Sequence, residues 1–267
     1  MRDGGGHVIN WLYALPEIVL LALPMATLVL AVLYGPRLVR RIPAAAPANA
    51  SPEFSQAVQT TLFTLVGLAL TFTLVQADIN FRQAESSVTT EAARLDQLDR
   101  LLTRYGDPRA SAIRPLLKNY ARAIVEHDWP AMLSDRQDKA TTRAFTPISK
   151  GVLAIEPGSP RQTLILGEML KSLDSIAEAR AARLSLATVE LPNIYWVVVL
   201  FAVAIVVFVS CTIPRTPFRT LLLVAQAAVL GAFVGFVFVM DQPFKGQTAI
   251  GPDSFVQTIA RMEARTD

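Results

Sequence analysis

The sequence is poor in the residues on which enzymes and soluble domains depend. It has one cysteine and two histidines among 267 residues, which excludes a disulfide framework and a cysteine metal cluster. Only 18% of the residues are charged, against ~25% in soluble globular proteins. Hydrophobic residues make up 52% of the chain, which argues against disorder and favours a membrane protein.

Motifs for catalysis are also absent. His7 and His127 lie far apart and belong to no metal-binding spacing, and no nucleophile elbow, phosphate-binding loop or dinucleotide fingerprint is present. Residues 126–128 could supply an acid, a base and a ligand, but the following Trp129 and Pro130 favour a helix stop pinned by an aromatic ring. The net charge of +3 is spread among carboxylates. We therefore expect no enzyme activity, metal, cofactor or nucleic-acid partner.

Four apolar segments are long enough to cross a bilayer, since a spanning helix needs ~20 residues. Arginines at positions 37, 40 and 41 follow the first segment, so we interpret it as a retained helix and not as a cleaved signal peptide. A tight turn at residues 214–217 joins the last two segments. The four segments are residues 11–34, 58–77, 194–213 and 218–240.

Residues 78–193 differ in composition, because they hold 31 of the 47 charged residues. No break occurs between Ala77 and Glu91, so the second span should continue directly into this insert. Apolar residues there recur at three–four spacing, which predicts that one helix face carries Val88, Ala92, Leu95, Leu98, Leu102 and Tyr105. Gly106 to Pro108 should end that helix. Further helices are expected over residues 109–126 and 135–153. After a loop at residues 157–160, a long last helix should run towards Pro192 and the third span.

The expected fold is an all-α membrane protein with four transmembrane helices in two hairpins and a helical extramembrane insert between the second and third. The predicted parts are an N-terminal hairpin (1–77) with a basic loop (36–57), the insert (78–193), a C-terminal hairpin (194–240) and a tail (241–267).

The second span carries a stripe of small and polar residues on one face, at ~100° per residue. Such a stripe suits the wall of a water-filled path, because threonine hydroxyls can contact a partly hydrated ion. It also suits close helix packing, and both interpretations stay open. The stripe consists of Gln56, Thr60, Thr64, Gly67, Thr71 and Asp78.

The fourth span has Ala227, Gly231 and Gly235 at four-residue spacing, which predicts a helix contact with the third span or with another copy of the chain. After this span, Phe244 could lie at the membrane interface and Lys245 could reach lipid phosphate or Asp241. Alternatively, Asp241 could pair with an arginine at the base of the insert, at position 82 or 180.

Three segments resemble the bestrophin-like family of bacterial membrane proteins. They are LFTLVGLALTFTLVQAD (62–78), IVEHDWPAML (124–133) and MDQPFKG (240–246). Gln242 stands where the family commonly has arginine, so no role of that arginine is carried over. The family signature covers Asp241, Pro243, Phe244, Lys245 and Gly246, with Trp129 and Pro130 in the second segment.

The resemblance implies a multi-pass protein of the bacterial inner membrane that assembles as a homo-oligomer. It implies an ion channel that conducts small ions along the second span. The alternative is a non-conducting, membrane-anchored module that binds or senses a partner through the insert.

The short loops predict the orientation of the chain, because Lys and Arg in short loops favour the cytoplasm. The loop arginines place the insert outside the cytoplasm, so reporter fusions at Gly106 and Gly158 should behave as extracytoplasmic. A fusion at Ala46 should behave as cytoplasmic. The reverse result at all three positions would refute the argument from the loop arginines.

Overall fold

The computed structural model describes residues 16–39, 52–133, 139–189 and 191–265, and within these ranges it contains helices and no strand. The expected all-α class is therefore confirmed. The chain divides into two compact units. We call residues 1–81 with 190–242 the membrane unit, and residues 82–189 with 243–267 the insert unit.

Four helices are long and apolar enough to cross a membrane, which confirms the four predicted spans. The first two extend into the predicted loop 36–57, while residues 11–15 and 40–51 lie outside the described ranges. The helices are α2 (Glu17–Val39), α3 (Pro52–Tyr105), α8 (Asn193–Thr212) and α9 (Pro217–Met240).

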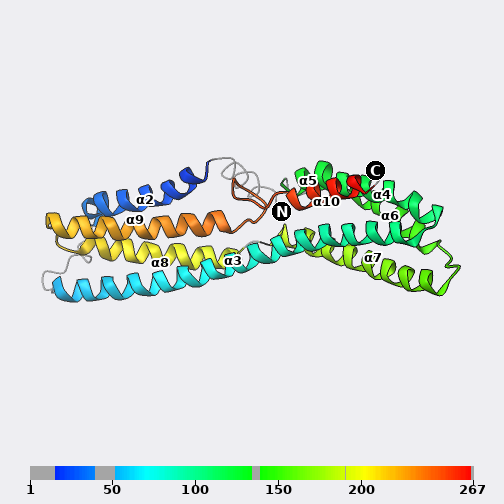
Figure 1. Ribbon diagram of the computed structural model, residues 1–267. Coiled ribbons are helices and arrows are strands. Elements are labelled where there is room, and N and C mark those ends of the chain that lie inside the picture. Colours follow the sequence, from blue (N-terminus) through cyan, green and yellow to red (C-terminus); the bar gives the residue numbers. More distant parts are fainter. Residues whose placement is uncertain (1–15, 40–51, 134–138, 190, 266–267) are drawn as a thin grey trace. The chain divides into compact units, whose positions relative to one another are not determined.

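The most extensive helix contact in the membrane unit joins α2 to α9 (Figure 1). A Cβ atom at Gly231 would lie 2.7 Å from the Met25 backbone nitrogen, and one at Gly235 would lie 2.8 Å from the Leu20 carbonyl oxygen. Only glycine permits this approach. The small residues of α9 thus face α2, and not the third span or another copy as predicted. The chain order suggests an α2–α3 hairpin, but the main contact of α2 is with α9.

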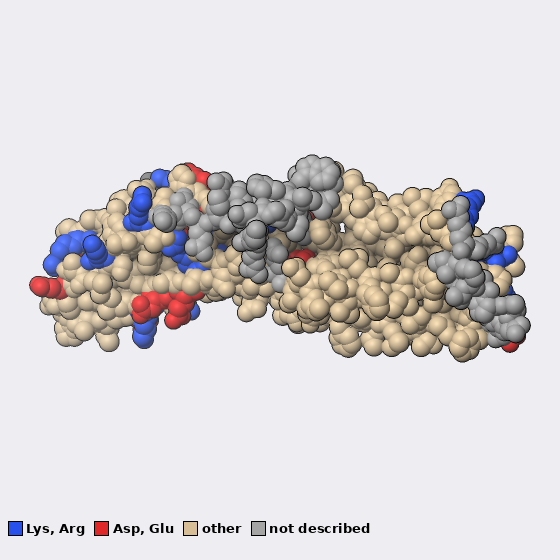
Figure 2. Space-filling view, turned by 180° about the vertical axis from the view of Figure 1, so that it is seen from behind, with Lys and Arg blue, Asp and Glu red and all other residues tan. Residues whose placement is uncertain are grey.

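The remaining membrane helices share one apolar cluster, to which α3 contributes Leu70, α8 contributes Val203 and Val206, and α9 contributes Leu230. Large apolar side chains such as Phe201 point outward. On the face shown in Figure 2, the membrane unit is free of charge over most of its length, and charged residues, mainly Lys and Arg, gather at one end. This surface fits hydrocarbon along the helices and water at the ends.

The insert unit packs the second half of α3 with six shorter helices. Val88, Leu95 and Leu102 on the predicted apolar face of α3 are buried in one core. Helix α4 contacts α6 and α10, and α6 contacts α7. The six are α4 (Pro108–Ala123), the π-helix η2 (Ile124–Asp128), α5 (Trp129–Leu133), α6 (Lys139–Leu153), α7 (Pro160–Leu186) and α10 (Asp253–Ala264).

The end of α3 follows the sequence closely. Tyr105 is its last residue, and Gly106 adopts φ of 73°, a left-handed conformation that glycine tolerates. The Asp107 carboxylate then accepts the Arg109 backbone N–H at 2.7 Å, and Pro108 occupies the first position of α4. The predictions of an unbroken α3 and of its end are confirmed.

Two local features differ from expectation. Trp129 and Pro130 do not stop the helix, because α4 continues through the π-turn η2 into α5. The Trp129 N–H bonds the carbonyl of Ile124, five residues back, so the wider turn carries the chain past the proline. The predicted tail also contains a helix, α10, whose Phe255 and Met262 are buried in the insert core.

Candidate membrane path and its supporting contacts

The polar stripe of α3 occupies one flank of the helix. The buried face of α3 in the membrane unit carries Gln59, Val66 and Leu70. At ~100° per residue, Thr64 and Thr71 lie about 120° to one side of this face. Leu65 and Phe72 lie about as far to the other side and are 56% and 68% exposed. One exposed flank is therefore hydroxylated and the other is apolar.

The stripe threonines bond their own helix. The hydroxyls of Thr60, Thr64 and Thr71 donate to the carbonyls of Gln56, Thr60 and Gly67 at 3.0, 2.9 and 2.8 Å. Each hydroxyl proton is thus engaged, which leaves the oxygen lone pairs pointing away from the helix. These three oxygens can accept hydrogen bonds from water or contact a cation.

No other part of the described chain covers the centre of the stripe. A Cβ atom at Gly67 would have no neighbour within 4 Å, and Thr60, Thr64 and Thr71 are exposed. Gln56 and Asp78, at the two ends, are half-buried. Within the described residues, the centre of the stripe therefore packs against no other helix. Its open face is available to water, lipid or another copy.

The signature carboxylate Asp241 lies at the end of α9 and joins it to the start of α8. Its two oxygens accept the Leu191 backbone N–H at 2.7 Å and the Trp196 indole N–H at 3.4 Å. Arg180 bonds the Thr142 hydroxyl at 3.1 Å and lies 3.7 Å from Asp128. The coupling of Asp241 to an arginine of the insert stays a prediction.

The next signature residues belong to the insert unit. Phe244 is buried and packs edge-on against Trp129, with ring centroids 5.9 Å apart. The expectation that Phe244 lies at the lipid interface is therefore wrong, because Trp129 provides an apolar site for it. Lys245 is also buried, and Gly246 has φ of 100°. The Pro243 carbonyl accepts the Ile250 N–H at 2.9 Å.

A fully buried ionic network, which sequence reasoning missed, lies beside Trp129. The Arg183 guanidinium donates to Glu91 at 2.7 Å and to Asp128 at 3.0 Å, and its charge lies 5.6 Å from the centre of the Trp129 ring. The Tyr120 hydroxyl donates to Glu91 at 3.2 Å. The network joins four helices, α3, α4, η2 and α7. Its residues are far apart in sequence, so no local pattern predicts it.

The π-helix η2 directs the side chains of residues 126–128, the candidate acid–base group, to different surroundings. Asp128 points into the network, whereas Glu126 and His127 are exposed. The three side chains therefore do not converge on one point. Among the described residues, no group of three or more His, Cys, Asp or Glu side chains could hold a metal ion.

Burial sets the proton affinities of this network. It raises the pKa of Glu91 above the usual range more than the Arg183 guanidinium lowers it. Burial also raises the pKa of Tyr120, and the Glu91 charge adds to this effect. Burial acts to lower the pKa of Arg183, but pairing with Glu91 and Asp128 outweighs it and keeps that pKa raised. Two carboxylates thus compete for one fully buried guanidinium.

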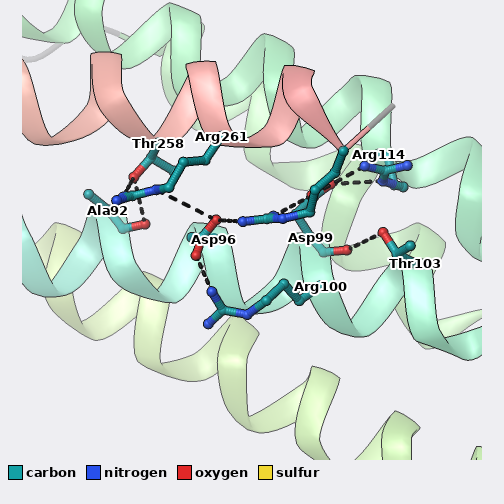
Figure 3. Close-up of polar contacts among 9 residues, drawn as sticks. Ala92, Asp96, Asp99, Arg100, Thr103, Arg114, Thr258 and Arg261 are labelled. Carbon is teal, nitrogen blue, oxygen red and sulfur yellow. Dashed lines mark hydrogen bonds and ion pairs between the residues drawn. The ribbon is translucent and has the colours of Figure 1, made fainter. Parts of the chain in front are cut away.

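A second ionic cluster ties α10 to α3 (Figure 3). Asp99 accepts from Arg114 of α4 at 2.9 Å and from Arg265, just after α10, at 2.7 Å. Asp96 also pairs with Arg265. The Thr258 hydroxyl of α10 donates to the Ala92 carbonyl of α3 at 3.4 Å. These contacts fix the C-terminal helix in the insert unit.

Comparison with known proteins places the chain in a family. The Bestrophin-like domain matches residues 24–255, which confirms the resemblance drawn from the three segments. A leucine-to-threonine variant of a bacterial bestrophin homologue from Klebsiella pneumoniae shares the fold with a TM-score of 0.68 and 14% identity, over 92% of this chain and 97% of that one. An isoleucine-to-threonine variant gives 0.67 and 14%, over 92% and 98%. No curated protein matches the chain.

The raised pKa of Glu91 predicts a pH dependence of stability. The folded state holds this proton more tightly than the unfolded chain, so the stabilisation is full below the ordinary pKa of 4.5 and declines as pH rises through the folded pKa. Glu91→Gln cannot titrate. In urea titrations of the full chain in detergent, the wild type should lose stability relative to Glu91→Gln as pH rises from 4.5.

The matched control has the opposite sign. Hydrogen bonds from Arg109 lower the pKa of Asp107, so its stabilisation is present above the ordinary pKa and is lost as pH falls through the folded pKa. Relative to Asp107→Asn, the wild type should gain stability as pH rises. A pH-independent difference for Glu91→Gln would contradict the account of the buried network.

Proposed function

The chain belongs to the Bestrophin-like family, and we propose that it forms a homo-oligomeric ion channel in which α3 lines the path. The observation that carries the proposal is the hydroxyl stripe of α3, which no other part of the described chain covers at its centre. Lipid is a poor neighbour for polar groups, so a polar flank favours contact with water or another protein surface.

The described part of one chain offers no enclosed path along the stripe. The buried face of α3 is occupied by α8 and α9, as the cluster around Leu70, Val203 and Leu230 shows. The threonine flank lies outside this cluster, so a path along it requires other copies of the chain. Rotational symmetry would bring the same flank of each α3 to a common axis.

The chemistry of the flank suits a hydrated ion. Thr60, Thr64 and Thr71 present oxygen lone pairs. Gly67 has no side chain and leaves open space between Thr64 and Thr71. Asp78 lies near the end of the part of α3 that belongs to the membrane unit. Its carboxylate would favour cations at that end of the path. No stripe residue between Gln56 and Asp78 is charged, so an ion would pass this length with most of its hydration shell.

The proposal includes a location and an orientation. The apolar outer surfaces of α2 and α8 suit lipid, and we assign the protein to the bacterial inner membrane. The loop arginines favour an insert unit on the extracytoplasmic side, and we include this orientation in the proposal. No catalytic step, metal or cofactor is assigned to the chain.

Cysteine accessibility tests whether the stripe faces water. In a Cys211→Ser background, cysteines introduced at Thr64 and Thr71 should react with a water-soluble thiol reagent in membranes, because the reactive thiolate forms only where water reaches. Cysteines at Leu65 and Phe72 should react at least about tenfold more slowly, because thiolate formation is suppressed in hydrocarbon.

Leu65 and Phe72 are matched controls, because they are exposed on the same turns of the same helix. Equal protection at all four positions would contradict the proposal and favour the non-conducting binding module. In that case, Gly67→Leu should disrupt assembly, because the stripe would be a close contact between copies.

A further inference from the structure

A groove with both apolar and polar lining lies at the end of the membrane unit where α3 and α9 begin. It has a volume of about 230 Å³, and its polar lining comes from Gln56, Gln59 and Thr60 of α3 and from Arg219 and Gln226 of α9. Three glutamines and an arginine are costly in a transmembrane unit unless they bind one another or a ligand. Their hydrogen bonds decide which of these applies.

The orientation of the Gln59 amide follows from its neighbour. The Ser210 hydroxyl donates its only proton to the Val206 carbonyl at 2.7 Å, so it must accept from the Gln59 nitrogen, also at 2.7 Å. The Gln59 oxygen therefore points the other way. It is buried without a hydrogen-bond donor, on a side chain whose residue is only 4% exposed. Such an acceptor requires a donor from outside the described chain.

Gln226 presents a second acceptor. Its side-chain oxygen is also buried without a hydrogen-bond partner, and both glutamines line an adjoining void of about 10 Å³. That void suits one water molecule. The Thr60 hydroxyl already donates to the Gln56 carbonyl, so its oxygen can act only as an acceptor toward the groove. The groove thus offers several oxygen atoms that can accept a hydrogen bond from a ligand.

Arg219 adds a positive charge to the same groove. Its guanidinium has no hydrogen bond or ion pair with any described residue, although its backbone N–H bonds the Thr216 hydroxyl at 3.2 Å. It stands in the first turn of α9, where the helix dipole disfavours a cation and favours an anion. An anionic ligand would satisfy both the guanidinium and the helix end.

We propose that this groove binds the head group of an anionic phospholipid that carries hydroxyls, of the phosphatidylglycerol type. The phosphate pairs with Arg219, and the glycerol hydroxyls donate to the oxygens of Gln59 and Gln226. The lining favours a lipid over a soluble phosphate ester, because Leu222, which lines the groove beside Arg219, is 49% exposed and can contact acyl chains.

Simpler occupants satisfy only part of the site. Water would serve the glutamine oxygens but leave Arg219 without an anion. A chloride or sulfate ion would serve Arg219 but bring no protons to the amide oxygens. An ammonium lipid would place its positive charge beside Arg219. The proposal rests on the groove alone and does not require that the protein conducts ions.

Lipid titration of the delipidated full chain in detergent tests the proposal, with the unfolding temperature as readout. Phosphatidylglycerol should raise it more than phosphatidic acid, which lacks the head-group glycerol and its two hydroxyls, or phosphatidylethanolamine. Arg219→Gln should weaken phosphatidylglycerol binding roughly tenfold or more, because it removes a charge-assisted hydrogen bond. Arg219→Lys should retain most of the binding, and Gln226→Leu should abolish the preference over phosphatidic acid.

Arg37→Gln is the matched control, because Arg37 lies at the end of α2 and does not line the groove. This variant should bind phosphatidylglycerol as the wild type does. Equal stabilisation by phosphatidylglycerol and phosphatidic acid would overturn the proposal. So would unchanged binding by Arg219→Gln, which would leave water as the occupant, or an equal effect of soluble glycerol phosphate.

Discussion

Hydrocarbon offers no hydrogen bonds, and this constraint explains the polar chemistry of the membrane unit. The stripe threonines donate hydrogen bonds to carbonyls of their own helix, the Gln59 amide donates to the Ser210 hydroxyl, and Arg215 donates to the Val32 carbonyl at 2.8 Å. Polar groups of the membrane unit that the described chain does not cover therefore indicate contact with water, a ligand or another copy. The flank of α3 around Thr64 and the groove around Arg219 are two places of this kind.

Much of the fold could be predicted from the sequence, because its largest features are local. Four apolar segments fixed the spans, and the three–four spacing from Val88 to Tyr105 identified the buried face of α3. Gly106 to Pro108 marked the end of that helix through turn chemistry alone. The stripe was also visible as a helical pattern, but its exposure depends on which helices pack against α3.

The features that the sequence did not reveal depend on contacts between distant residues. Arg183 lies 92 residues from Glu91 and 55 from Asp128, so no local pattern joins them. Phe244 was expected at the lipid surface because it follows a span, but Trp129 buries it. The spacing of Ala227, Gly231 and Gly235 predicted a helix contact but not its partner, because small-residue spacing carries no information about the opposing helix.

The central claim is that the threonine flank of α3 faces an ion path formed by several copies of the chain. Reversal potentials of Thr64→Asp and Thr64→Lys, recorded in planar bilayers under a KCl gradient, test it most directly. A charge in the path should shift ion selectivity, so Asp should favour cations and Lys should favour anions. Shifts of opposite sign are predicted. Identical reversal potentials with intact currents, or no current from the wild-type protein, would contradict the account.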